Sequence, residues 1–224
     1  MTRPERFAAV IDYFKVARPE AETELVFGDT YELLVAVILS AQCTDKRVNM
    51  TTPALFAQYP DVQALSKASY DDLFAIIKSI SFPGNKTRHL MGMAKMVMEE
   101  FNGTIPMTVE ELVRLPGVGR KTAHVITSVV DKQPNMAVDT HVFRVSARIG
   151  LTVNARTPLQ TELQLVKYIP EALVHKFHHW LILHGRYICM ARRPKCTECG
   201  LKPVCKYYHT VVRKEMLKRS NKHG

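Results

Sequence analysis

Apolar residues recur along most of this chain at the three- and four-residue spacing of an α-helix. The stretch "SYDDLFAIIKSI" places four of them on one helical face: Leu73, Ile76, Ile77 and Ile80. The stretch "HLMGMAKMVMEEF" continues the same period and ends at Asn102-Gly103, a pair that commonly terminates helices. Because no segment carries the turn signals of an antiparallel sheet, the pattern predicts an all-α protein with short loops.

Two helix starts are marked by capping residues. Ser69 precedes one apolar-periodic stretch, and Thr108 is followed three residues later by Glu111, which is the spacing of a capping box. The run Leu33–Leu39 within "YELLVAVILSAQ" is less decisive. Its β-branched residues would also suit a buried strand.

Composition narrows the class of protein. The 224 residues, 46% of them hydrophobic, can bury the core of one large domain or of two smaller ones. The net charge of +10 favours a polyanionic partner, although a ribosomal or membrane-surface protein would also fit it.

Targeting signals are missing from the expected places. The run Leu33–Leu39 is far shorter than the roughly 20 residues that span a bilayer. The N-terminal stretch contains Glu5 and Asp12 and has no uninterrupted apolar segment of the signal-peptide kind. We therefore expect a soluble cytoplasmic protein with no membrane partner, and we expect the basic tail after Cys205 to fray.

The stretch "LPGVGRKTAHV" predicts a helix-hairpin-helix turn. Pro116 ends the first helix, while Gly117 and Gly119 permit a tight turn and a close approach of phosphate to the backbone. The N–H groups that open the second helix, beside Arg120, would form an anion site that reads no base sequence. The alternative is an ordinary turn between two helices.

Four cysteines near the C-terminus have the spacing of a metal site. Cys189, Cys196, Cys199 and Cys205 form the pattern C-x6-C-x2-C-x5-C, whereas Cys43 stands apart. In an intracellular chain this density indicates metal ligation rather than disulfides. The spacing alone leaves both tetrahedral zinc and an iron–sulfur cluster open. Four nearby histidines are better explained as helix-face or core residues: His175, His178, His179 and His184.

Several motifs in one order resemble endonuclease III, a family of helix-hairpin-helix DNA glycosylases and abasic-site lyases. They are "LLVAVILSAQCTD", "LPGVGRKTAHV", "AVDTHVFRV", "HHWLILHGRYIC" and the four cysteines, and the similarity extends over nearly the whole chain. The resemblance implies a six-helix barrel with the hairpin over residues 24–134. Residues 1–23 and 135–224 would form a 4Fe–4S cluster domain, with a DNA groove between the two. It also implies a monomer associated with the nucleoid.

Lys121 and Asp139 carry the chemistry that the resemblance implies. A lysine attacks carbon only after losing its proton, which burial and the positive end of a helix both favour. By resemblance Lys121 displaces the damaged base at C1′, forms a Schiff base and cleaves the strand by β-elimination. Asp139 matches the catalytic aspartate on the facing wall of the groove. From the residues alone, Lys121 could be a phosphate-facing cation and Asp139 a helix N-cap.

The resemblance also implies contacts with DNA. The cluster would be 4Fe–4S and would present Arg192, Arg193 and Lys195, in the loop "MARRPK", to phosphates. Gln42 and Phe82 match the residues that fill the gap left by a flipped nucleotide. Phe82 stands where the family carries leucine, and the following Pro83-Gly84 also departs from the pattern. Burial in the core is the alternative for both side chains.

The expected substrate is double-stranded DNA containing damaged bases or abasic sites, the bases being oxidised or ring-saturated pyrimidines. Two rival functions remain at this point. Monofunctional adenine glycosylases share the hairpin, the aspartate and the cluster but lack a lysine at the position of Lys121. A non-catalytic helix-hairpin-helix DNA-binding module with a structural metal would need neither Lys121 nor Asp139.

Overall fold

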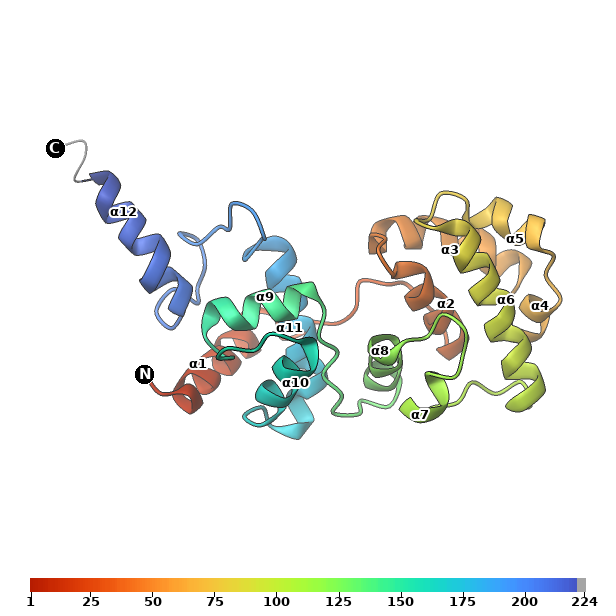
Figure 1. Ribbon diagram of the computed structural model, residues 1–224, viewed down its shortest axis with the longest axis horizontal. Coiled ribbons are helices and arrows are strands. Elements are labelled where there is room, and N and C mark those ends of the chain that lie inside the picture. Colours follow the sequence, from red (N-terminus) through yellow and green to blue (C-terminus); the bar gives the residue numbers. More distant parts are fainter. Residues whose placement is uncertain (221–224) are drawn as a thin grey trace. The chain divides into compact units, whose positions relative to one another are not determined.

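The computed structural model describes the backbone of residues 1–220, and its regular structure within that range is entirely helical (Figure 1). The predicted all-α class is confirmed. No helix in this range is long and apolar enough to cross a membrane.

The chain divides into two compact units. We call Thr23–Asn135 the hairpin unit, and Met1–Glu22 together with Met136–Gly224 the cysteine unit, of which residues 221–224 are not described. Each unit has its own cluster of buried apolar side chains.

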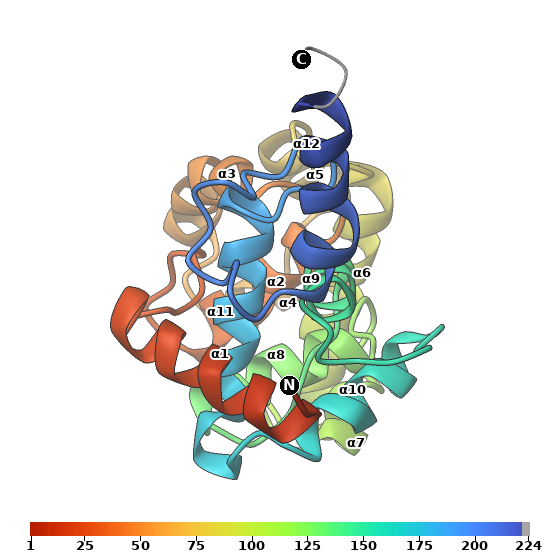
Figure 2. The same cartoon turned by 90° about the vertical axis from the view of Figure 1, so that its left-hand side faces the viewer.

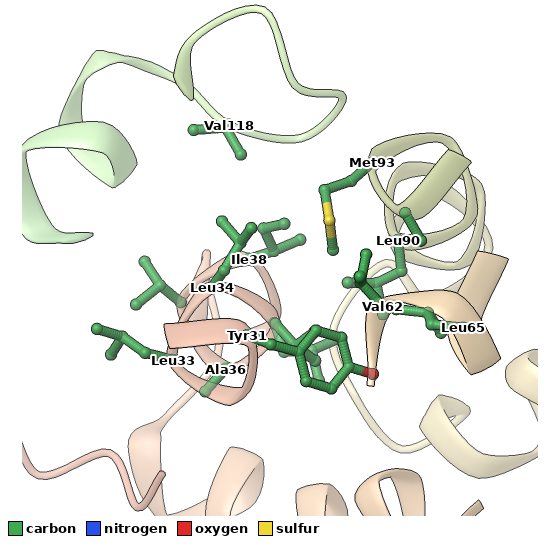
Figure 3. Packing of buried hydrophobic residues seen from close by; sticks show 14 of the residues in the cluster. Tyr31, Leu33, Leu34, Ala36, Ile38, Val62, Leu65, Leu90, Met93 and Val118 are labelled. Carbon is green, nitrogen blue, oxygen red and sulfur yellow. The ribbon is translucent and has the colours of Figure 1, made fainter. Parts of the chain in front are cut away.

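The hairpin unit is built around one fully embedded helix. Its helices are α2 (Thr30–Ser40), α3 (Asp45–Gln58), α4 (Val62–Ser66), α5 (Tyr70–Ile77), α6 (Pro83–Glu100), α7 (Val109–Leu112) and α8 (Arg120–Val130). Helix α2 contacts α3, α6 and α8. Figure 3 shows its Leu34 and Ile38 in one cluster with Leu90 and Met93 of α6 and Val118 of the hairpin turn. Leu33–Leu39 form the middle of α2, so the strand alternative for this run is wrong. Their apolar side chains point to all sides because the helix is buried.

The predicted caps are present with one difference. The Ser69 hydroxyl accepts a hydrogen bond from the Asp72 N–H at the start of α5. At the start of α7 the Thr108 hydroxyl accepts from the Glu111 N–H, as predicted, but it also donates to the Glu111 carboxylate at 2.7 Å. That carboxylate therefore binds the capping hydroxyl instead of the reciprocal backbone N–H of a closed capping box.

The cysteine unit joins the two ends of the chain. It contains α1 (Arg3–Ala17), α9 (Thr140–Ile149), α10 (Pro158–Val166), a short 3-10 turn (Glu171–Leu173) and α11 (Val174–Tyr187). Helix α1 lies against α11, as Figures 1 and 2 both show. There Phe14 stacks on Trp180 with ring centroids 5.5 Å apart, and the Trp180 indole donates to the Arg18 carbonyl at 2.7 Å.

The segment after α11 departs from the sequence-based expectation. Residues 188–207 run mostly without helix, but a π-helical turn (Tyr208–Val212) then leads into α12 (Arg213–Ser220). The tail therefore does not fray directly after Cys205. Its Lys, Glu, Met, Leu and Arg residues are good helix formers, which accounts for α12. The end of the tail lies outside the described residues.

Candidate functional site

The hairpin turn between α7 and α8 is wedged against α6. Gly117 has a φ of +82°, which favours glycine, and a Cβ added there would lie 2.8 Å from the Cβ of His89. A Cβ added at Gly92 of α6 would lie 3.2 Å from the Pro116 ring. Gly117 is therefore required by its backbone conformation and close packing, and Gly92 lets the turn pack tightly on α6.

Gly119 differs from these two glycines. Its φ of −89° suits any residue, and a Cβ added to it would meet nothing within 4 Å. It is the N-cap of α8 and provides no side-chain cap for the first N–H groups of that helix. The missing side chain therefore leaves open space over a helix N-terminus, which is a suitable place for an anion such as phosphate.

Arg120 and Lys121 are the first two residues of α8, and both side chains are exposed. The expectation that burial helps Lys121 to lose its proton is therefore wrong for the protein without DNA. The reason is its place on the helix: Ala123 and Ile126 turn into the core, and Lys121 lies on another face.

Asp139 is the N-cap of α9 in the cysteine unit. Its Oδ1 accepts hydrogen bonds from the backbone N–H groups of His141 and Val142, both at 2.8 Å, and its Oδ2 lies 3.0 Å from the His141 ring Nδ1. Its side chain is 14% exposed. The carboxylate is thus held in one orientation by a helix terminus and an imidazole. His141 lies inside the motif "AVDTHVFRV" but was not singled out by sequence reasoning.

Lys121 and Asp139 belong to different units, the first to the hairpin unit and the second to the cysteine unit. Their meeting across a groove stays a prediction.

Gln42 and Phe82 share an unusual backbone conformation. Their φ angles are 55° and 56°, in the left-handed region that costs a residue with a side chain about 1–3 kcal/mol. Both side chains are exposed, Phe82 by 59%. The alternative that either one fills the core is therefore wrong. Strained, exposed residues held by a rigid surrounding are a frequent feature of binding sites.

Lys86 joins the segments that carry these two residues. Its side chain is 5% exposed, and its Nζ donates to the carbonyls of Leu39 and Ala41. Burial lowers the pKa of Lys86 from its ordinary value, and the nearby Cys43 thiol opposes this effect. Sequence reasoning missed Lys86, because nothing in its local pattern distinguishes a buried lysine from an exposed one.

The four C-terminal cysteines line one cavity in the cysteine unit. All four are half-buried, and the cavity is also lined by Ile149, Ile188 and Leu201. Burial raises the pKa of the Cys199 thiol to about 11, and the charges of the other three cysteines add to the effect, so the sulfur atoms lie near one another. Within the described residues, however, no three His, Cys, Asp or Glu side chains are placed to hold a single metal ion.

Arginine side chains secure the cysteine loop by binding its backbone carbonyls. Arg144 donates to the Cys189 carbonyl at 3.2 Å, and Arg148 donates to those of Met190 at 2.7 Å and Ala191 at 3.0 Å. Both arginines lie on α9. No local sequence pattern signals these contacts, because residues more than forty positions away accept the hydrogen bonds.

The remaining predicted residues of this unit lie as follows. Arg192, Arg193 and Lys195 are exposed on the cysteine loop. Three histidines of α11 are buried, as expected: His178, His179 and His184. His175 is half-buried on the same helix. His184 additionally places its Nε2 3.5 Å from the Cys199 Sγ.

Residues 35–171 match the HhH-GPD superfamily of base excision DNA repair proteins, and the chain belongs to this family. Within it, the chain is similar to proteins named endonuclease III. It is 41% identical to that of Rickettsia felis over 91% of this chain and 95% of the relative. It is 42% identical to that of Bacillus subtilis over 90% of this chain and 92% of the relative.

Solved structures agree with this placement. An endonuclease III trapped as a covalent intermediate with DNA is 38% identical, with a TM-score of 0.89 over 96% of this chain and all of that one. A non-covalent endonuclease III–DNA complex gives 0.90 over 95% of this chain. The predicted family, fold and role in base excision repair are therefore confirmed.

Proposed function

We propose that this chain is a bifunctional DNA glycosylase and abasic-site lyase that acts as a monomer on duplex DNA and excises oxidised or ring-saturated pyrimidines. One observation carries the proposal. The chain belongs to a base excision repair family, and its hairpin places an exposed lysine, Lys121, at the N-terminus of the second helix. A relative of the same fold has been trapped covalently on DNA.

Binding begins at the phosphate backbone. A phosphate fits the open N-terminus of α8 beside Gly119. There its oxygens accept hydrogen bonds from backbone N–H groups, and Arg120 lies next to it. The exposed Arg192, Arg193 and Lys195 of the cysteine loop supply further cations. These contacts carry no sequence information, as a repair enzyme that must scan all DNA requires.

Excision requires the damaged nucleotide to leave the base stack. Gln42 and Phe82 are exposed side chains on rigid turns of the hairpin unit, and we assign them to the space that the nucleotide vacates. A phenylalanine can insert between base pairs and kink the duplex.

Lys121 then acts as the nucleophile. Its neutral amine forms a bond to C1′ while the glycosidic bond breaks, and the damaged base leaves with the bonding electrons. Opening of the sugar ring gives the Schiff base. Removal of a C2′ proton then expels the 3′ phosphate by β-elimination. Lys121 is exposed in the free protein, so its desolvation comes from the bound DNA.

Asp139 stabilises the positive charge that develops on the sugar. Its carboxylate is fixed by two backbone N–H groups and the His141 ring, so it needs no reorientation during the reaction. This role requires Asp139 and Lys121 to meet at the bound nucleotide.

We assign the four cysteines to a 4Fe–4S cluster. The donor set fits, since four thiols line one cavity. When bound, the cluster supplies a covalent crosslink that orders residues 189–205. Purified protein should be brown with broad visible absorbance. Colourless protein with stoichiometric zinc would contradict the assignment.

The test of the function compares Lys121→Gln with Arg120→Gln, a matched change at the neighbouring residue. With abasic-site DNA, the wild type should cleave the strand to a β-elimination end and cross-link under borohydride. Lys121→Gln should lose both activities and still bind, whereas Arg120→Gln should bind more weakly and still cross-link. Cross-linking by Lys121→Gln would overturn the assignment, and binding without any cleavage by the wild type would favour the non-catalytic module.

A further inference from the structure

Lys86 is a buried lysine whose charge is not paired with any carboxylate among the described contacts. Its ammonium group lies between α6, which carries it, and the end of α2, where it donates to the Leu39 carbonyl at 2.8 Å and the Ala41 carbonyl at 2.7 Å. Taking an ammonium group out of water is costly unless polar groups replace the water. The desolvation of the Lys86 ammonium group therefore calls for a structural or functional reason.

The end of α2 supplies the acceptors. The last carbonyls of a helix have no partner within the helix, and the negative end of its dipole attracts cations. Helix α2 has no basic residue in its own last turn, and its C-cap is Ala41. Lys86 therefore provides from α6 what α2 lacks, and it fixes the carbonyl that directly precedes Gln42.

The backbone of Lys86 reaches the second strained residue. Its N–H donates to the Phe82 carbonyl at 3.2 Å in the first turn of α6. One residue thus bonds to Phe82 through its backbone and to Ala41 through its side chain. Lys86 thus connects the turn that carries Gln42 to Phe82, two left-handed residues that lie far apart in the sequence.

We propose that Lys86 is a positioning residue that fixes the spacing between Gln42 and Phe82, so that both side chains enter the duplex together when a nucleotide is extruded. The inference rests on the proposed function and adds a residue that touches neither DNA nor the reacting atoms. Without the ammonium group, the last carbonyls of α2 lose their partner and the turn at Gln42 is free to relax.

The test separates opening of the duplex from chemistry at the sugar. Lys86→Met removes the donor at similar length, Lys86→Arg keeps a cation, and Lys95→Met makes the same change at an exposed lysine on the same helix. Two rates are measured under single turnover: excision of an oxidised pyrimidine from duplex DNA, and cleavage of an abasic site in single-stranded DNA, which requires no flipping.

Lys86→Met should slow excision from the duplex by about tenfold or more while changing single-strand cleavage by less than about threefold. Lys86→Arg should recover most of the duplex rate, and Lys95→Met should leave both rates unchanged. Equal losses in the two assays would indicate a merely structural role and overturn the inference, as would an unchanged duplex rate. If Lys86→Met fails to fold, the same comparison is made with Lys86→Gln, which removes the positive charge but keeps an NH₂ donor on a shorter side chain.

A third measurement distinguishes this inference from the proposed function. The fluorescence of 2-aminopurine placed beside an abasic site in duplex DNA reports unstacking without any bond cleavage. A weaker increase with Lys86→Met than with Lys95→Met supports the positioning role even if the wild type proves to have no lyase activity. Equal increases contradict the role even if Lys121 proves to form the Schiff base.

Discussion

The two units of this protein hold their loops in different ways. In the hairpin unit the loops are short turns between buried helices, and their shape comes from glycine packing and left-handed residues such as Gly117, Gln42 and Phe82. In the cysteine unit the long segment 188–207 also contains a left-handed residue, Arg193, and a closely packed glycine, Gly200, and arginine side chains additionally bind its carbonyls. Packing therefore shapes the turns of both units, and the cysteine loop is held in addition by several arginine hydrogen bonds to its carbonyls, where the hairpin unit has those of Lys86 to the end of α2.

This difference leads to the largest expected effect. Cys199→Ala should release the cysteine loop, so that backbone amides of residues 189–205 exchange hydrogen on the order of a hundredfold faster while α2 and α6 keep their protection. Cys43→Ala, a change outside the loop, is the matched control and should leave both regions unchanged. Exchange that rises equally in both units after Cys199→Ala would show that the units do not differ in this way.

The stability of the two units should also respond differently to acid, and this effect should be smaller. Burial lowers the pKa values of His179 and His184 to about 4, with His175 and Arg186 adding to the effect at His179 and Arg18 at His184. Unfolded histidines bind protons near pH 6.5, so the free energy of unfolding should fall as pH drops from about 6.5 to about 4, by roughly 3 kcal/mol for each group.

The measurement is hydrogen exchange or chemical denaturation across this pH range. The cysteine unit should lose protection first, since it holds three buried histidines and the hairpin unit holds one, His124. His179→Gln should remove part of the acid sensitivity. It leaves His184, which lies beside Cys199, unchanged. A stability that stays flat between pH 7 and about 4 would contradict the expectation.

The smallest expected effects lie in the hairpin turn and separate its two glycines. Gly117→Ala should destabilise the protein by about 1–3 kcal/mol, because its φ of +82° and the 2.8 Å approach to His89 both resist a Cβ. Gly119→Ala should change stability by less than about 0.5 kcal/mol but weaken DNA binding by roughly tenfold. Thermal unfolding and binding titrations check these two expectations. Normal DNA binding by Gly119→Ala would contradict the proposed phosphate position beside Gly119.

Much of the helical architecture could be predicted, because apolar period and capping residues are local signals. Ser69 and Thr108 mark helix starts in the structure as they do in the sequence. The helix at Leu33–Leu39 could not be separated from a strand by local pattern alone, since a segment buried on all sides has no polar face to set a period.

Only part of the candidate site could be predicted from the sequence. Motif resemblance nominates Lys121, Asp139 and the cysteines, but the exposure of Lys121 depends on the face of α8 that meets the core. The contacts of Lys86, Arg144 and Arg148 join residues more than forty positions apart. Such contacts arise from tertiary packing and leave no local pattern.

In the proposed reaction, Lys121 forms a covalent bond to the sugar of damaged DNA. The most direct measurement is to reduce the wild-type complex with borohydride, digest the protein, and locate the modified lysine by mass spectrometry. A sugar adduct is expected on the peptide that contains Lys121. An adduct on another lysine, or no adduct despite strand cleavage, would contradict it.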